Sequence, residues 1–147
     1  MSQRRLLEQK PNGNAIILLA EDDEGFRRIV RNGLRRLGHT VIDAADGNAA
    51  LAAWATHNKE VSALVTDMLM PGGIDGLDLA RKLREDRPEL CVLLMSGDIL
   101  EVAFSDPSVL ERERLSFITK PFNIRTLNEE IRVALENGRR TMDVESP

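Results

Sequence analysis

The stretch Val61-Ser62-Ala63-Leu64-Val65-Thr66-Asp67 is a short, mostly apolar run that ends in a carboxylate. The turn-forming sequence Met68-Leu69-Met70-Pro71-Gly72-Gly73 follows it directly. An apolar run of this length, bounded by a Pro/Gly turn, predicts a buried strand over residues 61–66. A carboxylate at the end of such a strand contributes little to packing, because a buried charge costs free energy unless it is paired. Asp67 is therefore a candidate reactive group.

Three other apolar runs also end in polar residues. Residues 16–20 lead into Glu21-Asp22-Asp23, residues 91–95 into Ser96-Gly97, and residues 115–119 into Lys120-Pro121. In an open parallel sheet, ligands bind just beyond the carboxyl ends of the strands. We therefore expect these acids, this hydroxyl group and this ammonium group to converge on one site with Asp67.

The rest of the chain alternates between strand and helix patterns. Strands are predicted over residues 15–20, 40–43, 61–66, 90–95 and 115–119, and helices over 24–37, 48–56, 75–87 and 123–136. Residues 97–114 are less regular, with helical character over 99–104, a break at Asp106-Pro107 and further helical character over 108–114. The alternation implies an α/β fold with a parallel sheet covered on both faces.

Length and composition exclude several functional classes. A chain of 147 residues fits one domain, which we place at 15–137, between a polar tail or linker over 1–14 and a frayed end over 138–147. The formal net charge of −4 argues against a broad surface for nucleic acid. The apolar runs are too short to cross a membrane. One cysteine cannot form an internal disulfide, so we expect a cytoplasmic protein.

The three carboxylates of Glu21, Asp22 and Asp67 form a candidate metal site. An all-oxygen set of this kind suits Mg²⁺, or Mn²⁺, while leaving room for several bound waters. Alternatively, Glu21-Asp22-Asp23 is a solvated cap that the dipole of the following helix favours. The third carboxylate, at the end of another strand, favours the metal.

The remaining polar groups fit phosphoryl transfer to Asp67. A carboxylate can accept a phosphoryl group as an acyl phosphate, and the transfer needs cationic and hydroxyl donors around the phosphoryl oxygens. Lys120 and Ser96 would supply them. Alternatively, Lys120 is an ordinary surface lysine and Ser96 a turn residue. The Lys120-Pro121 bond is a candidate cis peptide that would turn the ammonium group toward the site.

These motifs together resemble the receiver domain of two-component response regulators. The matching segments are Leu18-Leu19-Ala20-Glu21-Asp22-Asp23, Thr66-Asp67-Met68-Leu69-Met70-Pro71, Met95-Ser96-Gly97 and Thr119-Lys120-Pro121-Phe122, within residues 15–136. The resemblance implies a doubly wound, flavodoxin-like sheet of five parallel strands in the order 2-1-3-4-5. It also implies that Asp67 is the phosphoacceptor, Glu21 and Asp22 the acid pair, Ser96 the switch hydroxyl and Lys120 the phosphate-sensing lysine.

Two further roles come from the resemblance alone. The backbone carbonyl of Leu69 would be another metal ligand, and Phe117 would be the aromatic switch residue, with a buried strand side chain as the alternative for its resting state. The sequence also departs from the family pattern. A glycine is inserted in Pro71-Gly72-Gly73-Ile74-Asp75-Gly76, and Glu111-Arg112-Glu113-Arg114 lacks the usual Gly-Ala.

The expected partners follow from the same resemblance. The phosphoryl donor would be a histidine kinase or a histidine phosphotransfer protein, and the downstream target would be another protein. We expect no DNA-binding domain in this chain and no enzyme activity beyond its own phosphorylation and dephosphorylation. We expect a single-domain receiver. The glycine insertion and the Ser-Gly pair resemble receivers of hybrid kinases, so a hybrid-kinase receiver, with residues 1–14 as a linker, is the alternative context. The alternative is a pseudo-receiver, a protein interaction module that is not phosphorylated.

Overall fold

The computed structural model describes residues 15–97 and 107–145, and within them it contains one five-stranded parallel sheet. The strands are β1 (Ile16–Ala20), β2 (Thr40–Ala44), β3 (Ala63–Asp67), β4 (Cys91–Ser96) and β5 (Ser116–Thr119), in the spatial order β2-β1-β3-β4-β5. The helices are α2 (Glu24–Arg36), α3 (Gly47–His57), α4 (Gly76–Asp86), α6 (Pro107–Arg112) and α7 (Ile124–Glu145). The predicted fold class and strand order are confirmed.

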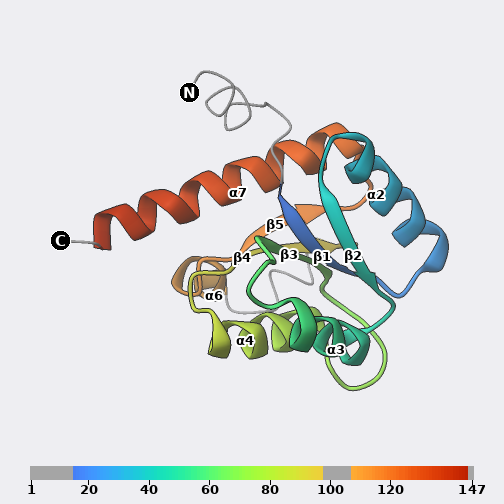
Figure 1. Ribbon diagram of the computed structural model, residues 1–147, viewed down its shortest axis with the longest axis horizontal. Helices are drawn as coiled ribbons and strands as arrows, with labels where there is room; N and C mark the ends of the chain where they lie inside the picture. The colour runs from blue at the N-terminus through green and yellow to red at the C-terminus, as the bar shows by residue number, and fades with distance from the viewer. Residues whose placement is uncertain (1–14, 98–106, 146–147) are drawn as a thin grey trace.

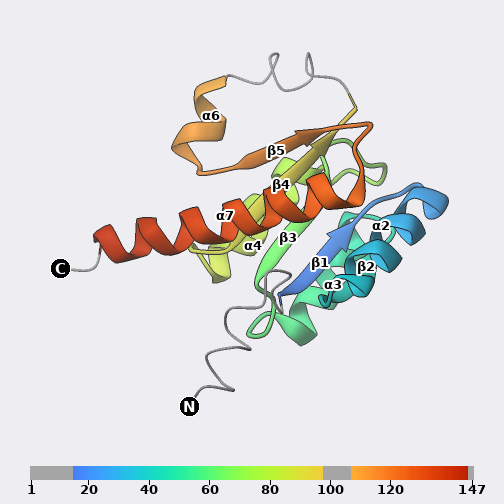
Figure 2. The same ribbon diagram turned by 90° about the horizontal axis from the view of Figure 1, so that it is seen from above.

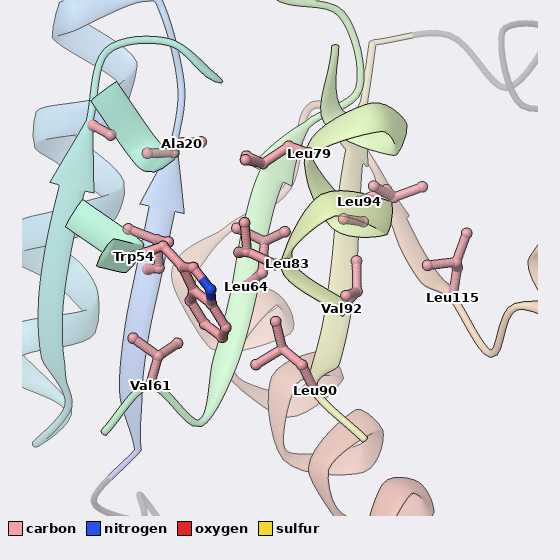
Figure 3. Packing of buried hydrophobic residues seen from close by; sticks show 14 residues of the cluster. Ala20, Trp54, Val61, Leu64, Leu79, Leu83, Leu90, Val92, Leu94 and Leu115 are labelled. Atoms are coloured by element: carbon pink, nitrogen blue, oxygen red, sulfur yellow. The ribbon is translucent and has the colours of Figure 1, made fainter. Parts of the chain in front are cut away.

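The helices cover the sheet in two layers, with α2 and α7 on one face and α3 and α4 on the other (Figures 1 and 2). Successive residues of a strand point to opposite faces. In β1, Leu18 and Ala20 pack with the α3 and α4 layer, whereas Ile17 and Leu19 pack with α2 and α7. Figure 3 shows the first of these two clusters, in which leucine side chains from α4 meet those of the strands. Burial on both faces explains why the strands read as continuous apolar runs.

Three aspartates determine where the helices start. The side chains of Asp23, Asp46 and Asp75 each accept a hydrogen bond from a backbone N–H in the first turn of α2, α3 and α4, over distances of 2.7–3.0 Å. These caps satisfy N–H groups that have no partner within the helix. Gly38, with a φ of 98°, follows the end of α2 in a conformation that favours glycine. The three caps thus fix where α2, α3 and α4 begin after the carboxyl ends of β1, β2 and β3.

The last helix corrects the prediction of a frayed end over 138–147. α7 continues through Gly138 to Glu145, and it extends past the edge of the sheet in Figures 1 and 2. A glycine stops a helix when it adopts a positive φ, but Gly138 is not among the glycines that do so. Its cost inside a helix is only about 1 kcal/mol relative to alanine.

The irregular segment before β5 is partly described. The helix expected over 99–104 lies outside the described residues. α6 begins at Pro107, the first helical position, where a missing N–H removes no hydrogen bond from the helix. Within residues 15–97 and 107–145, no helix combines the length and apolar character needed to cross a bilayer.

Candidate functional site

Three carboxylates meet at the carboxyl end of the central strands. β1 and β3 are neighbours with Ala20 paired to Thr66, so Glu21 and Asp22, which follow β1, lie beside Asp67 at the end of β3. One oxygen from each carboxylate lies within 4.8 Å of the other two. Glu21 is 1% exposed and Asp22 is exposed, so the cluster is buried on one side and open to solvent on the other. Such a group could hold a metal ion.

Lys120 joins this cluster from β5. Its Nζ lies 2.8 Å from Glu21 Oε1 and 3.4 Å from Asp67 Oδ2. The same Nζ is 4.6 Å from the centre of the Phe26 ring, which adds a cation–π contact. The Lys120-Pro121 peptide bond is cis. Lys120 is thus a site residue with two carboxylate partners rather than an ordinary surface lysine.

Burial shifts the pKa values of charged groups at this site, which has three carboxylates and one ammonium group. Burial raises the pKa of Glu21 above its ordinary value of 4.5 even though Lys120 donates to it. Burial likewise raises the pKa of Asp67 above 3.8, and the charge of Asp22 adds to the effect. Burial disfavours the charged form of Lys120 too, but the hydrogen bond to Glu21 and the charge of Asp67 outweigh it, and the pKa of Lys120 is raised. One ammonium group therefore does not compensate three carboxylates, and a further cation would be favourable.

The other predicted residues lie around this cluster. Ser96 is fully buried at the end of β4, and its carbonyl accepts a 2.7 Å hydrogen bond from the Lys120 N–H. Leu69 lies in the turn after β3 with its side chain 57% exposed. Phe117 is 37% exposed on the edge strand β5, so the alternative of a buried resting side chain is wrong. Ser96 follows Met95, the register partner of Asp67 on β4, whereas the Phe117 side chain is partly exposed.

Gly76 is a site residue that sequence reasoning missed. A Cβ at this position would lie 2.1 Å from the backbone oxygen of Asp67, so the start of α4 packs directly on the end of β3. The Gly76 N–H also donates a 2.9 Å hydrogen bond to the Met68 carbonyl. Only a residue without a side chain allows this approach. The signal in the sequence was the glycine that follows Asp75, the cap of α4.

The inserted glycine lies in a loop that leaves the carboxylates in place. Gly72 and Gly73 have φ values of 94° and 86°, a region that residues with a side chain rarely adopt. A Cβ on Gly72 would come no closer than 3.8 Å to Asn48 Nδ2, and one on Gly73 would have no atom within 4 Å. The two glycines are therefore explained by backbone conformation and not by close packing.

Comparison with known proteins identifies the family. The family model of the response regulator receiver domain matches residues 17–132. The response regulator receiver protein CpdR of Brucella abortus is 35% identical over 115 residues, which cover 78% of this chain and 92% of CpdR. The sensor kinase CckA of the same organism is 33% identical over 125 residues, or 85% of this chain, which spans only 13% of that kinase.

A solved structure agrees with this assignment. The receiver domain of the hybrid histidine kinase CckA superimposes with a TM-score of 0.67 at 30% identity, covering 82% of this chain and 99% of that domain. The alternation of strands and helices, the strand order and the acidic cluster are those expected from the sequence. The chain belongs to the response regulator receiver family, and it is a receiver domain of two-component signalling with a phosphoacceptor role.

Proposed function

We propose that Asp67 accepts the phosphoryl group and that a phosphohistidine of a histidine kinase or histidine phosphotransfer protein donates it. The observation that supports this is the contact of Asp67 Oδ2 with Lys120 Nζ at 3.4 Å, at the solvent-facing end of a central strand. An Asp67 oxygen attacks phosphorus, the P–N bond of the donor breaks, and the imidazole keeps the electron pair. The ammonium group of Lys120 stabilises the negative charge on the transferred phosphoryl oxygens.

We further propose that Glu21, Asp22 and Asp67, with the backbone carbonyl of Leu69, hold Mg²⁺ or Mn²⁺. The donor set fits such an ion, because carboxylate oxygens are preferred and one side of the cluster is open for water. The bound ion would neutralise charge on the phosphoryl oxygens. Lys120 pairs with the Glu21 and Asp67 carboxylates, and the Asp23 N–H also donates a 3.1 Å hydrogen bond to Glu21 Oε2.

Labelling tests the phosphoacceptor. Incubation with acetyl phosphate and Mg²⁺ should add one phosphoryl group, and hydroxylamine should remove it. Asp67→Asn should abolish this labelling, while Asp78→Asn, a change to an exposed residue of α4, should leave it intact. Undiminished labelling of Asp67→Asn would refute the assignment, and absent labelling of the unmodified protein would favour a pseudo-receiver.

Cation binding is tested separately. Mg²⁺ titration followed by amide chemical shifts should give weak, saturable binding that Asp22→Ala weakens at least tenfold. The same variant should not destabilise the ion-free protein, because it removes a repelling charge. Acidification should weaken binding at a pH above the ordinary carboxyl values of 3.8 and 4.5, since protons compete for carboxylates whose pKa is raised. An unchanged affinity in Asp22→Ala would contradict the proposed ligand set.

We propose that phosphorylation of Asp67 changes the conformation around Ser96 and Phe117. The Ser96 hydroxyl would bond to a phosphoryl oxygen, a charge-assisted hydrogen bond of about 1.5–3 kcal/mol. The space it leaves would admit Phe117, whose side chain is 37% exposed on the edge strand. Beryllofluoride with Mg²⁺ should shift the amides of Phe117 and of α6. Shifts confined to the residues around Asp67 would show that this coupling is absent.

A further inference from the structure

A second cluster of charged side chains lies between α4 and the segment that connects α6 to β5. It surrounds a cavity of about 330 Å³. The charged residues that line it are Arg81, Arg84, Glu85, Arg112, Glu113 and Arg114. Four arginines and two glutamates give a formal charge of +2, whereas the whole chain carries −4. The cavity is therefore a local concentration of positive charge on an acidic protein.

Arg84 contributes a positive charge that the surrounding contacts do not neutralise. Among the residues that the structure describes, its guanidinium donates to the carbonyl oxygens of Leu90, Glu113 and Arg114. Carbonyl dipoles satisfy its N–H groups but carry no net charge. Burial lowers the pKa of Arg84, and the neighbouring charge of Arg114 lowers it further. An anion in the cavity would offset the repulsion between the Arg84 and Arg114 guanidinium groups.

The carboxylate of Glu113 is already used by Arg81. Two hydrogen bonds join them, from Arg81 Nε to Oε1 at 2.9 Å and from Arg81 Nη2 to Oε2 at 2.8 Å. This parallel arrangement is the strong geometry for an arginine and a carboxylate. Glu85 is the other carboxylate of the lining.

Arg114 adopts a backbone conformation that is unfavourable for an arginine. Its φ of 54° lies in the left-handed region, which glycine occupies at lower cost. Its side chain donates a 3.2 Å hydrogen bond to the Pro88 carbonyl at the edge of the cavity. The positive φ is that of a helix C-terminal cap, because the Arg114 N–H donates to the Glu111 carbonyl at 3.1 Å and the Leu115 N–H to the Leu110 carbonyl at 2.8 Å.

We propose that this cavity binds a small organic phosphate. A phosphate monoester carries close to two negative charges at neutral pH, which matches the formal charge of the lining. Guanidinium groups pair with phosphate oxygens through two parallel hydrogen bonds. The apolar part of the ligand would lie against Ala80, Pro88 and Leu115, which complete the lining. The volume lies at the lower end of the range for small-molecule sites.

The cavity is separate from the phosphorylation site. Leu90 and Leu115 lie just before β4 and β5, at the amino ends of these strands, whereas Asp67 is at the carboxyl end of β3. Ligand binding in the cavity therefore does not depend on the proposed function of Asp67, and the two can be tested independently.

Amide chemical shifts during titration test the proposal. The full chain, kept free of Mg²⁺, is titrated with AMP, with inorganic phosphate and with the uncharged adenosine. AMP should give saturable shifts in the second half of α4 and in residues 111–116, with weaker binding of phosphate and the weakest of adenosine. The double variant Arg81→Gln/Arg112→Gln should weaken AMP binding at least tenfold, and Glu85→Gln should strengthen it.

A matched double variant controls for net charge. Arg28→Gln/Arg132→Gln removes the same charge from exposed ion pairs on α2 and α7. It should leave AMP binding unchanged, and thermal unfolding confirms that both double variants are folded. Three results would overturn the proposal: no saturable shifts at millimolar AMP, equal affinity of the two double variants, or shifts confined to Asp67 and Lys120.

Discussion

The two ends of the sheet carry opposite charge clusters that are stabilised in different ways. At the carboxyl end, one ammonium group contacts the buried Glu21 carboxylate and the partly exposed Asp67 carboxylate. At the amino end, the Arg84 guanidinium is held by backbone carbonyls. The carboxylates can be neutralised by protons or cations, but arginine keeps its charge at all accessible pH values. The first cluster should therefore respond to pH and metal, and the second only to anions.

β5 connects the two clusters. Leu115, which precedes the strand, lines the arginine cavity, and Lys120, which follows it, contacts Glu21 and Asp67. The strand itself has four residues. The following changes test how far the two ends differ in what stabilises them.

The largest effect is expected from Gly76→Ala. The new methyl group would clash with the Asp67 carbonyl oxygen, and both partners are backbone, so the loss in the free energy of unfolding should be about 3 kcal/mol or more. Gly25→Ala is the matched control in the first turn of α2, where a Cβ meets its nearest atom at an ordinary 3.5 Å. It should be neutral or slightly stabilising. Urea unfolding measures both, and similar losses would contradict the close approach at Gly76.

Lys120→Met should cost about 3 kcal/mol at neutral pH, because it leaves buried carboxylates without their cation. Burial already raises the pKa of Glu21 and Asp67, and loss of the ammonium group raises both further. The folded state then binds protons at a higher pH than the unfolded state, so the deficit should shrink as the pH falls toward about 5. Urea unfolding across this pH range checks whether the stability deficit of Lys120→Met shrinks on acidification. A deficit that grows on acidification would contradict the charge balance described for this site.

Arg84→Met should cost about 2 kcal/mol, since three carbonyl groups lose their donor. Unlike the loss from Lys120→Met, this loss should be the same between about pH 5 and 8, because arginine does not titrate there. Lys82→Met, an exposed change on the same helix, should stay within about 0.5 kcal/mol. If the stability losses of the Lys120 and Arg84 variants depended on pH in the same way, the proposed difference between the two ends of the sheet would be wrong.

The smallest effect is expected from Phe117→Ala, below about 1 kcal/mol, because the side chain is exposed on an edge strand. Its register partner Leu94 on β4 is fully buried, and Leu94→Ala should cost about 2–5 kcal/mol. Thermal unfolding of the Phe117→Ala and Leu94→Ala variants measures which of them loses more stability. A large loss at Phe117 would mean that the ring is buried in solution.

The sequence was sufficient for the sheet and for the carboxylate cluster. Apolar runs that end in polar residues predict both the strands and the edge at which Glu21, Asp67 and Lys120 meet, because strand direction alone places their ends together. The end of α7 was missed because the effect of Gly138 depends on its φ, which the local sequence does not determine.

The arginine cavity could not be predicted in the same way. Arg81 and Arg84 are ordinary polar positions of a helical pattern, and Arg112 and Arg114 belong to a segment with weak periodicity. Only the packing of α4 against the residues before β5 brings them together. Gly76 was missed for a similar reason, since its role depends on an approach between two backbones.

The central position of β3 has a consequence for how the protein opens. β3 is paired with β1 over residues 63–66 and with β4 over residues 63–67, and four of its five residues are buried. Its amide hydrogens should therefore exchange with deuterium only through the rarest, near-global unfolding events. Asp67 lies at the end of this strand, so we expect the proposed phosphorylation and dephosphorylation of its carboxylate to proceed while the strand stays closed.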